Sequence, residues 1–391
     1  MAEPRSNGHN STMTRTAHPD RRSLLATIAA GSLVPSLAFG QSVLDAASLG
    51  VVADSGQDQS QALQAALDQA AQTGQLLRLP PGVIDVIDLQ ITGNLVVEGV
   101  PGRSELAVSG GITVTTANAL TLREIGFTGG AVALTITGSE DVHIERCRFR
   151  AAAVGLGIDD AAVTVRDCTF TQMGDAAIHA INSRGTMISG NRISDCGNAG
   201  IRIWRDEQGP DGSIVSGNRI SAIGWVGGGN GQNGNGVNVF NADDVIVADN
   251  HIADCAFTAV RLNATSNNQV SGNVCLRSGE VAIFSEFGFS GSIIANNIID
   301  DAATGISITN LDTGGQLAVC SGNIVRNISP ASAVNPDTIP IGIFAEADTA
   351  ITGNSVQNVP GVSIAAGYGE FLRNVVIDGN MVSGSTIGIG V

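Results

Sequence analysis

The chain has 391 residues and a formal net charge of −16, with 36 acidic residues against 20 basic ones, all of them arginine. Such an acidic surface repels nucleic acid and anionic membranes, so neither is expected as a partner. It also disfavours polyanionic sugars, unless an arginine patch or bridging Ca²⁺ reverses the local field. The 50 glycines and the aromatic content of only 4% predict a core of aliphatic side chains.

The first 40 residues have the order of a secretion signal. Arg21 and Arg22 are adjacent, two leucines and a weakly apolar run follow, and the small residues Ala38 and Gly40 mark a cleavage site. This order is typical of twin-arginine (Tat) signals, and the run is too short for a membrane span of about 20 apolar residues. We expect residues 1–40 to engage the Tat translocon and to be removed. Residues 41–391 would then be periplasmic or secreted, with no transmembrane segment.

One helix is predicted near the start of the mature chain. Apolar residues at helical spacing form a single stripe over residues 62–70, Asp58 precedes it as a cap, and Gly74 ends it. Leu79-Pro-Pro-Gly and a strand follow. We expect residues 45–82 to form a cap that covers the open end of a strand stack.

From about residue 84 to residue 391 the chain repeats one phrase, in which a β-branched residue and two small residues precede an asparagine and a second alternating run. The asparagines lie 23 to 32 residues apart, which is the spacing of a solenoid. Strict alternation of apolar residues predicts strands and no second helix. The sequence therefore predicts an all-β fold, a right-handed parallel β-helix (solenoid) with a short N-terminal capping α-helix, whose stacked asparagine amides hydrogen-bond one another. The repeated positions are Cys147, Cys168, Asn191, Asn218, Asn250, Asn273, Asn297, Asn323, Asn354 and Asn380.

The repeats, and the cap order of helix, Leu-Pro-Pro-Gly and strand, resemble the pectate-lyase-like superfamily of right-handed parallel β-helices. With its twin arginines, the chain is most similar to the twin-arginine-translocated repeat-containing proteins of bacteria. The resemblance implies the fold, and an activity of the lyase, epimerase or hydrolase kind on a polysaccharide or oligosaccharide. The chain carries neither the NTD, DD, GHG and RIK motifs of polygalacturonases nor the DPHD motif of alginate epimerases. That absence puts catalysis itself in doubt.

Six cysteines are present, and none has the spacing of a metal site. Cys147 and Cys168 share one register in adjacent coils, which allows either a disulfide or two buried thiols. No cofactor is evident, although Ca²⁺ could bridge an acidic sugar. The chain stops in mid-coil, so either its last turns fold over the exposed edge or a second copy pairs with it end to end as a homo-oligomer.

Three turns between strands are enlarged: Arg205–Gly212, Ala222–Asn235 and Ser329–Pro340. Both tryptophans of the chain, Trp204 and Trp225, belong to the first two. Exposed aromatic rings can stack on sugars, which makes the pair a candidate sugar platform. Alternatively, each ring plugs its own loop, because aromatic residues are usually buried.

Alignment of the second strand of each coil predicts two outward rows, one largely polar and one largely aromatic. The first row holds His179, Arg202, Asn238, Arg261, Ala282 and Ser307, and the second holds Trp204, Phe240, Asn263 and Phe284. Such rows could grip an acidic sugar. They could equally form a plain surface network with the nearby carboxylates Asp206, Glu207, Asp243 and Asp244.

Two chemistries fit these residues. A lyase or epimerase would use Arg202 or Arg261 to neutralise a uronate, and His179 or an arginine as the base. A glycoside hydrolase would draw two carboxylates from Asp206, Glu207, Asp243, Asp244 and Glu286. The hypothesis from another class is a non-catalytic structural or adhesive solenoid, in which both tryptophans are buried and the carboxylates solvated.

Overall fold

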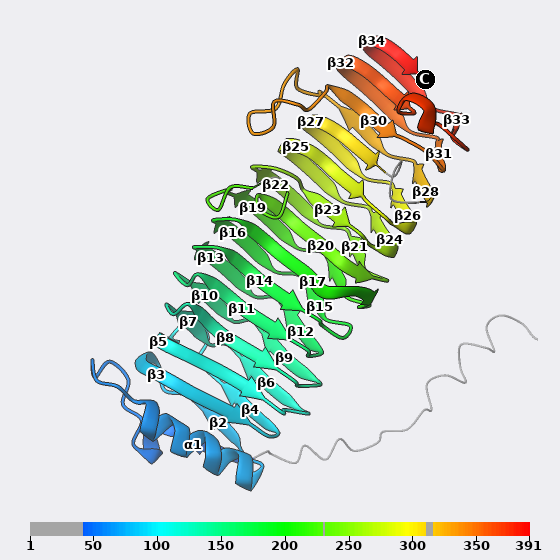
Figure 1. The fold of residues 1–391 in the computed structure, drawn as a ribbon. Helices are drawn as coiled ribbons and strands as arrows, with labels where there is room; N and C mark the ends of the chain where they lie inside the picture. Colours follow the sequence, from blue (N-terminus) through cyan, green and yellow to red (C-terminus); the bar gives the residue numbers. More distant parts are fainter. Residues whose placement is uncertain (1–41, 230, 310–315) are drawn as a thin grey trace, which may run out of the picture. The chain divides into compact units, whose positions relative to one another are not determined.

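The computed structural model describes residues 42–229, 231–309 and 316–391, and the predicted signal therefore lies outside the described residues. The described chain from residue 42 onward forms one stack of coils, and neighbouring strands pair in parallel along it (Figure 1). This arrangement confirms the predicted all-β parallel β-helix.

Within the described residues, one sheet contains 14 strands, each contributed by a successive coil. Its strands are β1 (Val43–Asp45), β2 (Leu76–Arg78), β4 (Leu95–Glu98), β6 (Leu120–Arg123), β9 (Val142–Glu145), β12 (Val163–Arg166), β15 (Met187–Ser189), β18 (Ile214–Ser216), β21 (Ile246–Ala248), β24 (Ser266–Ser271), β26 (Ser290–Ala295), β28 (Gln316–Ser321), β31 (Thr349–Thr352) and β33 (Val376–Asp378).

The other sheet contains 20 strands among the described residues, because most coils contribute either two short strands or one long, bent strand. Its strands are β3 (Gly82–Thr92), β5 (Ser104–Thr115), β7 (Gly126–Thr128), β8 (Val132–Thr137), β10 (Arg148–Arg150), β11 (Val154–Asp159), β13 (Thr169–Met173), β14 (Ala176–Ile181), β16 (Arg192–Cys196), β17 (Ala199–Pro210), β19 (Arg219–Ile223), β20 (Asn235–Asp243), β22 (His251–Cys255), β23 (Val260–Asn263), β25 (Val274–Glu286), β27 (Ile298–Thr309), β29 (Ile324–Arg326), β30 (Ile341–Ala345), β32 (Ser355–Ala366) and β34 (Met381–Gly390).

The predicted cap is present at the N-terminal end of the stack. Helix α1 (Ser60–Thr73) follows the short 3-10 helix η1 (Ala46–Leu49) and packs against β2 and β3. Its buried stripe consists of Leu63, Ala66, Leu67 and Ala70, and Gly74 ends it in the left-handed conformation. Asp58 accepts a hydrogen bond from the Ser60 N–H, although the capping position itself is Gln59. A second 3-10 helix, η2 (Gly369–Phe371), lies near the C-terminus.

The repeated asparagines form a continuous hydrogen-bonded ladder in one turn of each coil. From Asn191 to Asn354, each asparagine donates its backbone N–H and its Nδ2–H to the Oδ1 atom of the asparagine one coil further on, over 2.8 to 3.0 Å. The ladder begins where the Cys168 N–H donates to Asn191. The predicted amide ladder is confirmed, and it satisfies polar groups that would otherwise be buried without partners.

The core is mainly aliphatic, as predicted, but it also contains phenylalanines, among them Phe257 and Phe289. Phe127, Phe149 and Phe170 are fully buried and stack in successive coils at centroid distances of 4.9 and 4.6 Å. All six cysteines are free and buried, so Cys147 and Cys168 form no disulfide. Burial raises the pKa of the Cys255 and Cys275 thiols, which keeps both in the neutral form at physiological pH.

Two of the three enlarged turns are loops, and both extend from the same side of the stack (Figure 1). They connect β19 to β20 and β29 to β30, and we name them the first loop (residues 224–234) and the second loop (residues 327–340). The third turn, Arg205–Gly212, was wrongly predicted as a loop. Strand β17 continues to Pro210 through an irregularity in register between Trp204 and Gly209, where the extra residues bulge out of the sheet.

Candidate functional site

The predicted polar row exists. His179 pairs with Arg202, Arg202 with Asn238, and Asn238 with Arg261, on strands β14, β17, β20 and β23. The neighbouring row runs through Trp204, Phe240 and Asn263. We name the outward side of β11, β14, β17, β20, β23, β30 and the C-terminal parts of β25 and β27 the cavity face.

The predicted register was wrong in the coil after Arg261. Arg261 pairs with Phe284 rather than Ala282, and Asn263 pairs with Glu286. The error arises from Ser285, which occupies an inward position where the other coils carry an aliphatic residue. Ser285 is fully buried and shares a hydrogen bond of 3.2 Å with Ser292. A polar residue at a core position hides the alternation on which the prediction depended.

From Arg202 to Arg261 the polar row is buried, because the first loop folds over it, whereas His179 is half-buried. Arg202, Asn238 and Arg261 are 4%, 3% and 6% exposed. The amide of Asn238 donates to the Gly231 carbonyl at 3.3 Å. A Cβ atom at Gly231 would lie 2.5 Å from the Arg261 guanidinium carbon, so only glycine fits this close approach. Hydrogen bonds therefore hold the first loop against the row.

Arg202 is already paired with a carboxylate. Its Nη1 and Nη2 atoms donate to the two oxygens of Asp175 at 2.8 and 2.9 Å, and Nη2 also donates to Asn233 of the first loop. Burial would raise the pKa of Asp175, but its hydrogen bonds to Arg202 and Asn198 and the charge of Arg202 hold the pKa below its usual value. The guanidinium is thus neutralised within the protein, and it stands 5.1 Å from the centroid of the Trp204 ring.

Arg261 is paired with two carboxylates. It donates to Glu286 from Nε at 2.6 Å and from Nη2 at 2.9 Å, and to Glu280 from Nη1 at 3.3 Å. All three side chains are at most 8% exposed, and the guanidinium lies 4.8 Å from the Phe284 ring centroid. Arg202 and Arg261 pair with these other carboxylates and not with Asp206, Glu207, Asp243 or Asp244. The surface network predicted between the row and those four carboxylates is therefore not formed by the two arginines.

Six of the predicted residues line one cavity of about 510 Å³, which we name the Trp204 cavity. They are Trp204, Asn238, Phe240, Arg261, Asn263 and Glu286, and the other lining residues are Gly231, Gln232 and Phe287. The Trp204 ring is half-buried, and its Nε1–H donates to Asn238 at 3.3 Å. Its edge meets Phe240 on one side and His179 on the other. The cavity combines aromatic faces with amide and carboxylate groups.

A second cavity, of about 390 Å³, lies beyond Trp204 and contains two further candidates, His179 and Asp206, together with Asp159 and Asn182. We name it the His179 cavity. Burial, and then the charge of Arg202, lower the pKa of His179, so the imidazole is neutral near pH 7. Its Nε2 atom is buried without a hydrogen-bond partner. A neutral imidazole beside two carboxylates has the groups that general acid–base chemistry requires.

The remaining candidates lie apart from these two cavities. Asp243 accepts hydrogen bonds from the Ser266 N–H and from Gln208, and Asp244 accepts one from Asn267. Glu207 is exposed. Trp225 is half-buried, packs on Phe257 at 4.9 Å and donates to the carbonyl of Gly229 in its own loop.

Sequence reasoning missed the acidic partners of the buried arginines. Asp175 lies in the turn before β14, one coil before Arg202, and Glu280 lies at the register irregularity within β25, one coil after Arg261. The sequence signal for each partner was an acidic residue four positions before a residue of the row, in the coil next to that of the arginine. It became visible only once the register of the coils was known.

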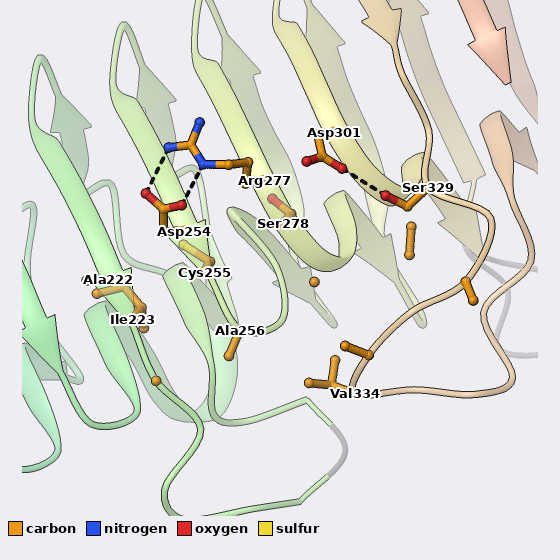
Figure 2. Close-up of a pocket in the computed structure, with 15 residues that line it drawn as sticks. Ala222, Ile223, Asp254, Cys255, Ala256, Arg277, Ser278, Asp301, Ser329 and Val334 are labelled. Carbon is orange, nitrogen blue, oxygen red and sulfur yellow. Dashed lines mark hydrogen bonds and ion pairs between the residues drawn. The ribbon is translucent and has the colours of Figure 1, made fainter.

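The largest of these cavities, about 620 Å³, lies elsewhere, between the two loops (Figure 2). Its walls are mainly small residues, and its charged groups are engaged: Arg277 pairs with Asp254, and Asp301 accepts a hydrogen bond from Ser329. It contains no aromatic side chain and none of the predicted site residues. Its larger volume alone therefore does not make it a better candidate for a functional site than the Trp204 and His179 cavities.

In residues 42–229, 231–309 and 316–391, no group of three or more His, Cys, Asp or Glu side chains is arranged to hold a metal ion. The Ca²⁺ expectation is untested by this observation. No helix among the described residues has the length and apolarity needed to cross a membrane.

The family model described as "Right handed beta helix region" matches residues 110–229 and 206–319. Together these matches span residues 110–319, more than half of the chain, so the chain belongs to the right-handed β-helix family. No curated protein matches the sequence.

Solved structures with the same fold include the catalytic unit of a GH87 α-1,3-glucanase from Streptomyces thermodiastaticus, with 16% identity, a TM-score of 0.57, and coverage of 88% of this chain and 69% of that one. The surface adhesin PfbA of Streptococcus pneumoniae is similar at 14% identity and a TM-score of 0.52, over 89% of this chain and 91% of the adhesin.

The enzymatically active domain of tailspike protein 2 of bacteriophage CBA120 is similar at 15% identity and a TM-score of 0.56. The match covers 72% of this chain but only 47% of the tailspike chain, so this chain spans about half the length of that relative. At such identities the likenesses show the fold alone.

Proposed function

We propose that the cavity face binds a polysaccharide or oligosaccharide, with Trp204 as the stacking platform. The observation that carries this proposal is the position of Trp204 between two cavities that hold eight of the predicted site residues. Aromatic rings flanked by amide and carboxylate groups suit the apolar faces and hydroxyl edges of sugars. The glucanase and tailspike likenesses support this choice of ligand class.

The test is a binding assay of the full chain against a panel of polysaccharides. We expect at least one glycan to bind, and Trp204→Ala to weaken that binding by about fivefold or more, because a stacking contact is worth about 1 kcal/mol or more. Trp225→Phe is the matched control, since Trp225 lines neither cavity and phenylalanine preserves the packing on Phe257. If no glycan binds, or if binding ignores Trp204, the structural or adhesive solenoid is the better account.

Glycoside hydrolysis is the second candidate function. Asp159, Asp206 and the neutral imidazole of His179 all line the His179 cavity, and hydrolysis requires two carboxyl groups. A lyase or epimerase is less well supported, because both arginines proposed to neutralise a uronate are already paired with carboxylates. Release of reducing sugar from the bound glycan, lost in Asp206→Asn with binding retained, would establish hydrolysis. Bound glycan that stays intact would exclude it.

We also propose export by the Tat pathway, because the adjacent Arg21 and Arg22 precede a weakly apolar run and small residues at the expected cleavage site. Fractionation of cells that express the full chain should place a shortened form in the periplasm or medium. Substitution of both arginines by lysine should leave the full-length form in the cytoplasm. Export that does not depend on these arginines would contradict the proposal.

A further inference from the structure

A third cavity continues the cavity face beyond the Trp204 cavity. It has a volume of about 360 Å³ and lies where the second loop meets β25, β27 and β30. Its aromatic residues are Phe284, Phe344 and Tyr368, and Phe284, Ser307 and Phe344 continue the row that begins at Arg261. We name it the Phe344 cavity. Of its residues, the sequence had placed only Ser307 and Phe284 in the outward rows, and Phe284 in the wrong row.

One buried network contributes to the walls of both cavities. Arg261 donates to Glu286, which lines the Trp204 cavity, and to Glu280, which lines the Phe344 cavity. The other oxygen of Glu280 accepts a hydrogen bond of 2.8 Å from Asn335 of the second loop. The network thus fixes the two cavities side by side and also anchors the second loop.

The charges that line the face are predominantly negative. Among the described residues, the lining of the three cavities contains one guanidinium, Arg261, against six carboxylates: Asp159, Asp206, Glu280, Glu286, Asp337 and Glu346. Arg261 is already neutralised by Glu286 and Glu280, and Arg202 behind Trp204 by Asp175. A uronate, sulfate or phosphate on a sugar would meet net repulsion at a low-dielectric surface. Sugar hydroxyl groups, in contrast, can donate to these carboxylates.

We propose, resting on the proposed function, that the cavity face takes an uncharged glycan chain that spans the Trp204 and Phe344 cavities. Five strand steps separate Trp204 on β17 from Phe344 on β30, which at roughly 4.8 Å per step is about 24 Å. Only an extended oligosaccharide covers that distance. The aromatic residues at each end supply stacking contacts, and the amide and carboxylate groups that line the two cavities supply polar ones.

The experiment is calorimetric titration of the full chain with uncharged gluco- and manno-oligosaccharides of increasing length, and with oligouronates of matched length. We expect uncharged oligosaccharides to bind, and matched oligouronates to bind at least about tenfold more weakly. Phe344→Ala should weaken binding of the longest oligosaccharides by about tenfold and leave the shortest ones unchanged. Leu317→Ala, at an exposed apolar residue that lines none of these cavities, is the matched control.

A second pair of variants tests the charge argument directly. Asp337→Asn removes one carboxylate from the Phe344 cavity and should raise the affinity for oligouronates several-fold. Asp249→Asn is the control, because Asp249 lies in a turn away from the cavities and Asn296 occupies the equivalent position two coils on. Equal gains in both variants would mean that only the overall charge matters, and would overturn the local argument.

The outcomes separate this inference from the proposed function. Oligouronates that bind as tightly as uncharged chains, through Trp204, would overturn the uncharged class while leaving a glycan site in place. Binding of uncharged chains that ignores Phe344 at every length would overturn the spanning mode. Absence of binding by every glycan would overturn the proposed function and this inference together.

Discussion

The turn that holds the asparagine ladder and the cavity face belong to the same coils, yet they differ in regularity. Along the ladder every coil repeats the same two amide hydrogen bonds from Asn191 to Asn380. On the cavity face the occupant changes at each coil from His179 to Arg202, Asn238, Arg261 and Phe284. The comparison teaches that repetition marks the structural side of the solenoid, whereas departures from repetition mark the side with a candidate site.

The strongest way to break the cavity face is Arg261→Met. The substitution leaves Glu280 and Glu286 buried without their cation, which costs about 3–5 kcal/mol of unfolding free energy. Thermal and denaturant unfolding should both show the loss. Adding Glu280→Gln and Glu286→Gln should recover part of it, because neutral amides need no cation. An unchanged unfolding midpoint in Arg261→Met would contradict the buried network.

The equivalent test of the ladder is Asn273→Ala. It removes the acceptor of the Asn250 backbone N–H and of the Asn250 amide, and loss of these buried partners should cost about 3 kcal/mol. Hydrogen exchange at Asn250 should accelerate more than exchange at the ends of the stack. The matched control is Asn94→Ala, an exposed asparagine in an upstream turn, whose loss should change the midpoint little.

The cavity face should also respond to pH. Because the pKa of His179 is lowered, the unfolded chain binds a proton near pH 6.5 that the folded chain binds only at lower pH. Stability should therefore fall as pH drops from about 6.5 towards the folded-state pKa, and the depressed pKa of Asp175 should add a further loss below about pH 4.

The measurement is the melting temperature of the protein and of His179→Gln between pH 7.5 and 5. The variant should show a smaller decline, while His251→Gln, outside the cavities, should follow the parent. Parallel curves for parent and His179→Gln would show that His179 does not cause the decline.

The smallest effect is expected for Arg277→Ala. Its two hydrogen bonds to Asp254 (Figure 2) have the same bidentate form as those of Arg261 to Glu286. The Arg277 side chain, however, is 52% exposed, whereas that of Arg261 is 8% exposed. Solvent screens such a pair, so removal should change the unfolding free energy by less than about 1 kcal/mol. A loss of unfolding free energy as large as that of Arg261→Met would contradict the distinction between exposed and buried ion pairs.

The sequence by itself determined the repeating part of this protein. Strand alternation and the spacing of the asparagines follow from local chemistry that is repeated in every coil, so the fold and the ladder could be predicted. The cap could be predicted because Gly74 is a local signal that ends its helix. The order of the polar row up to Arg261 followed from the same register.

Only the tertiary structure decided what covers that row and which charges meet there. The first loop buries Arg202 and Arg261, Ser285 hides the register of the next coil, and Asp175 and Glu280 reach their arginines from neighbouring coils. These contacts join residues 19 to 31 positions apart without any repeated signal. A loop's path over a strand depends on packing and on the pairing of buried charges, and neither is written in a local pattern.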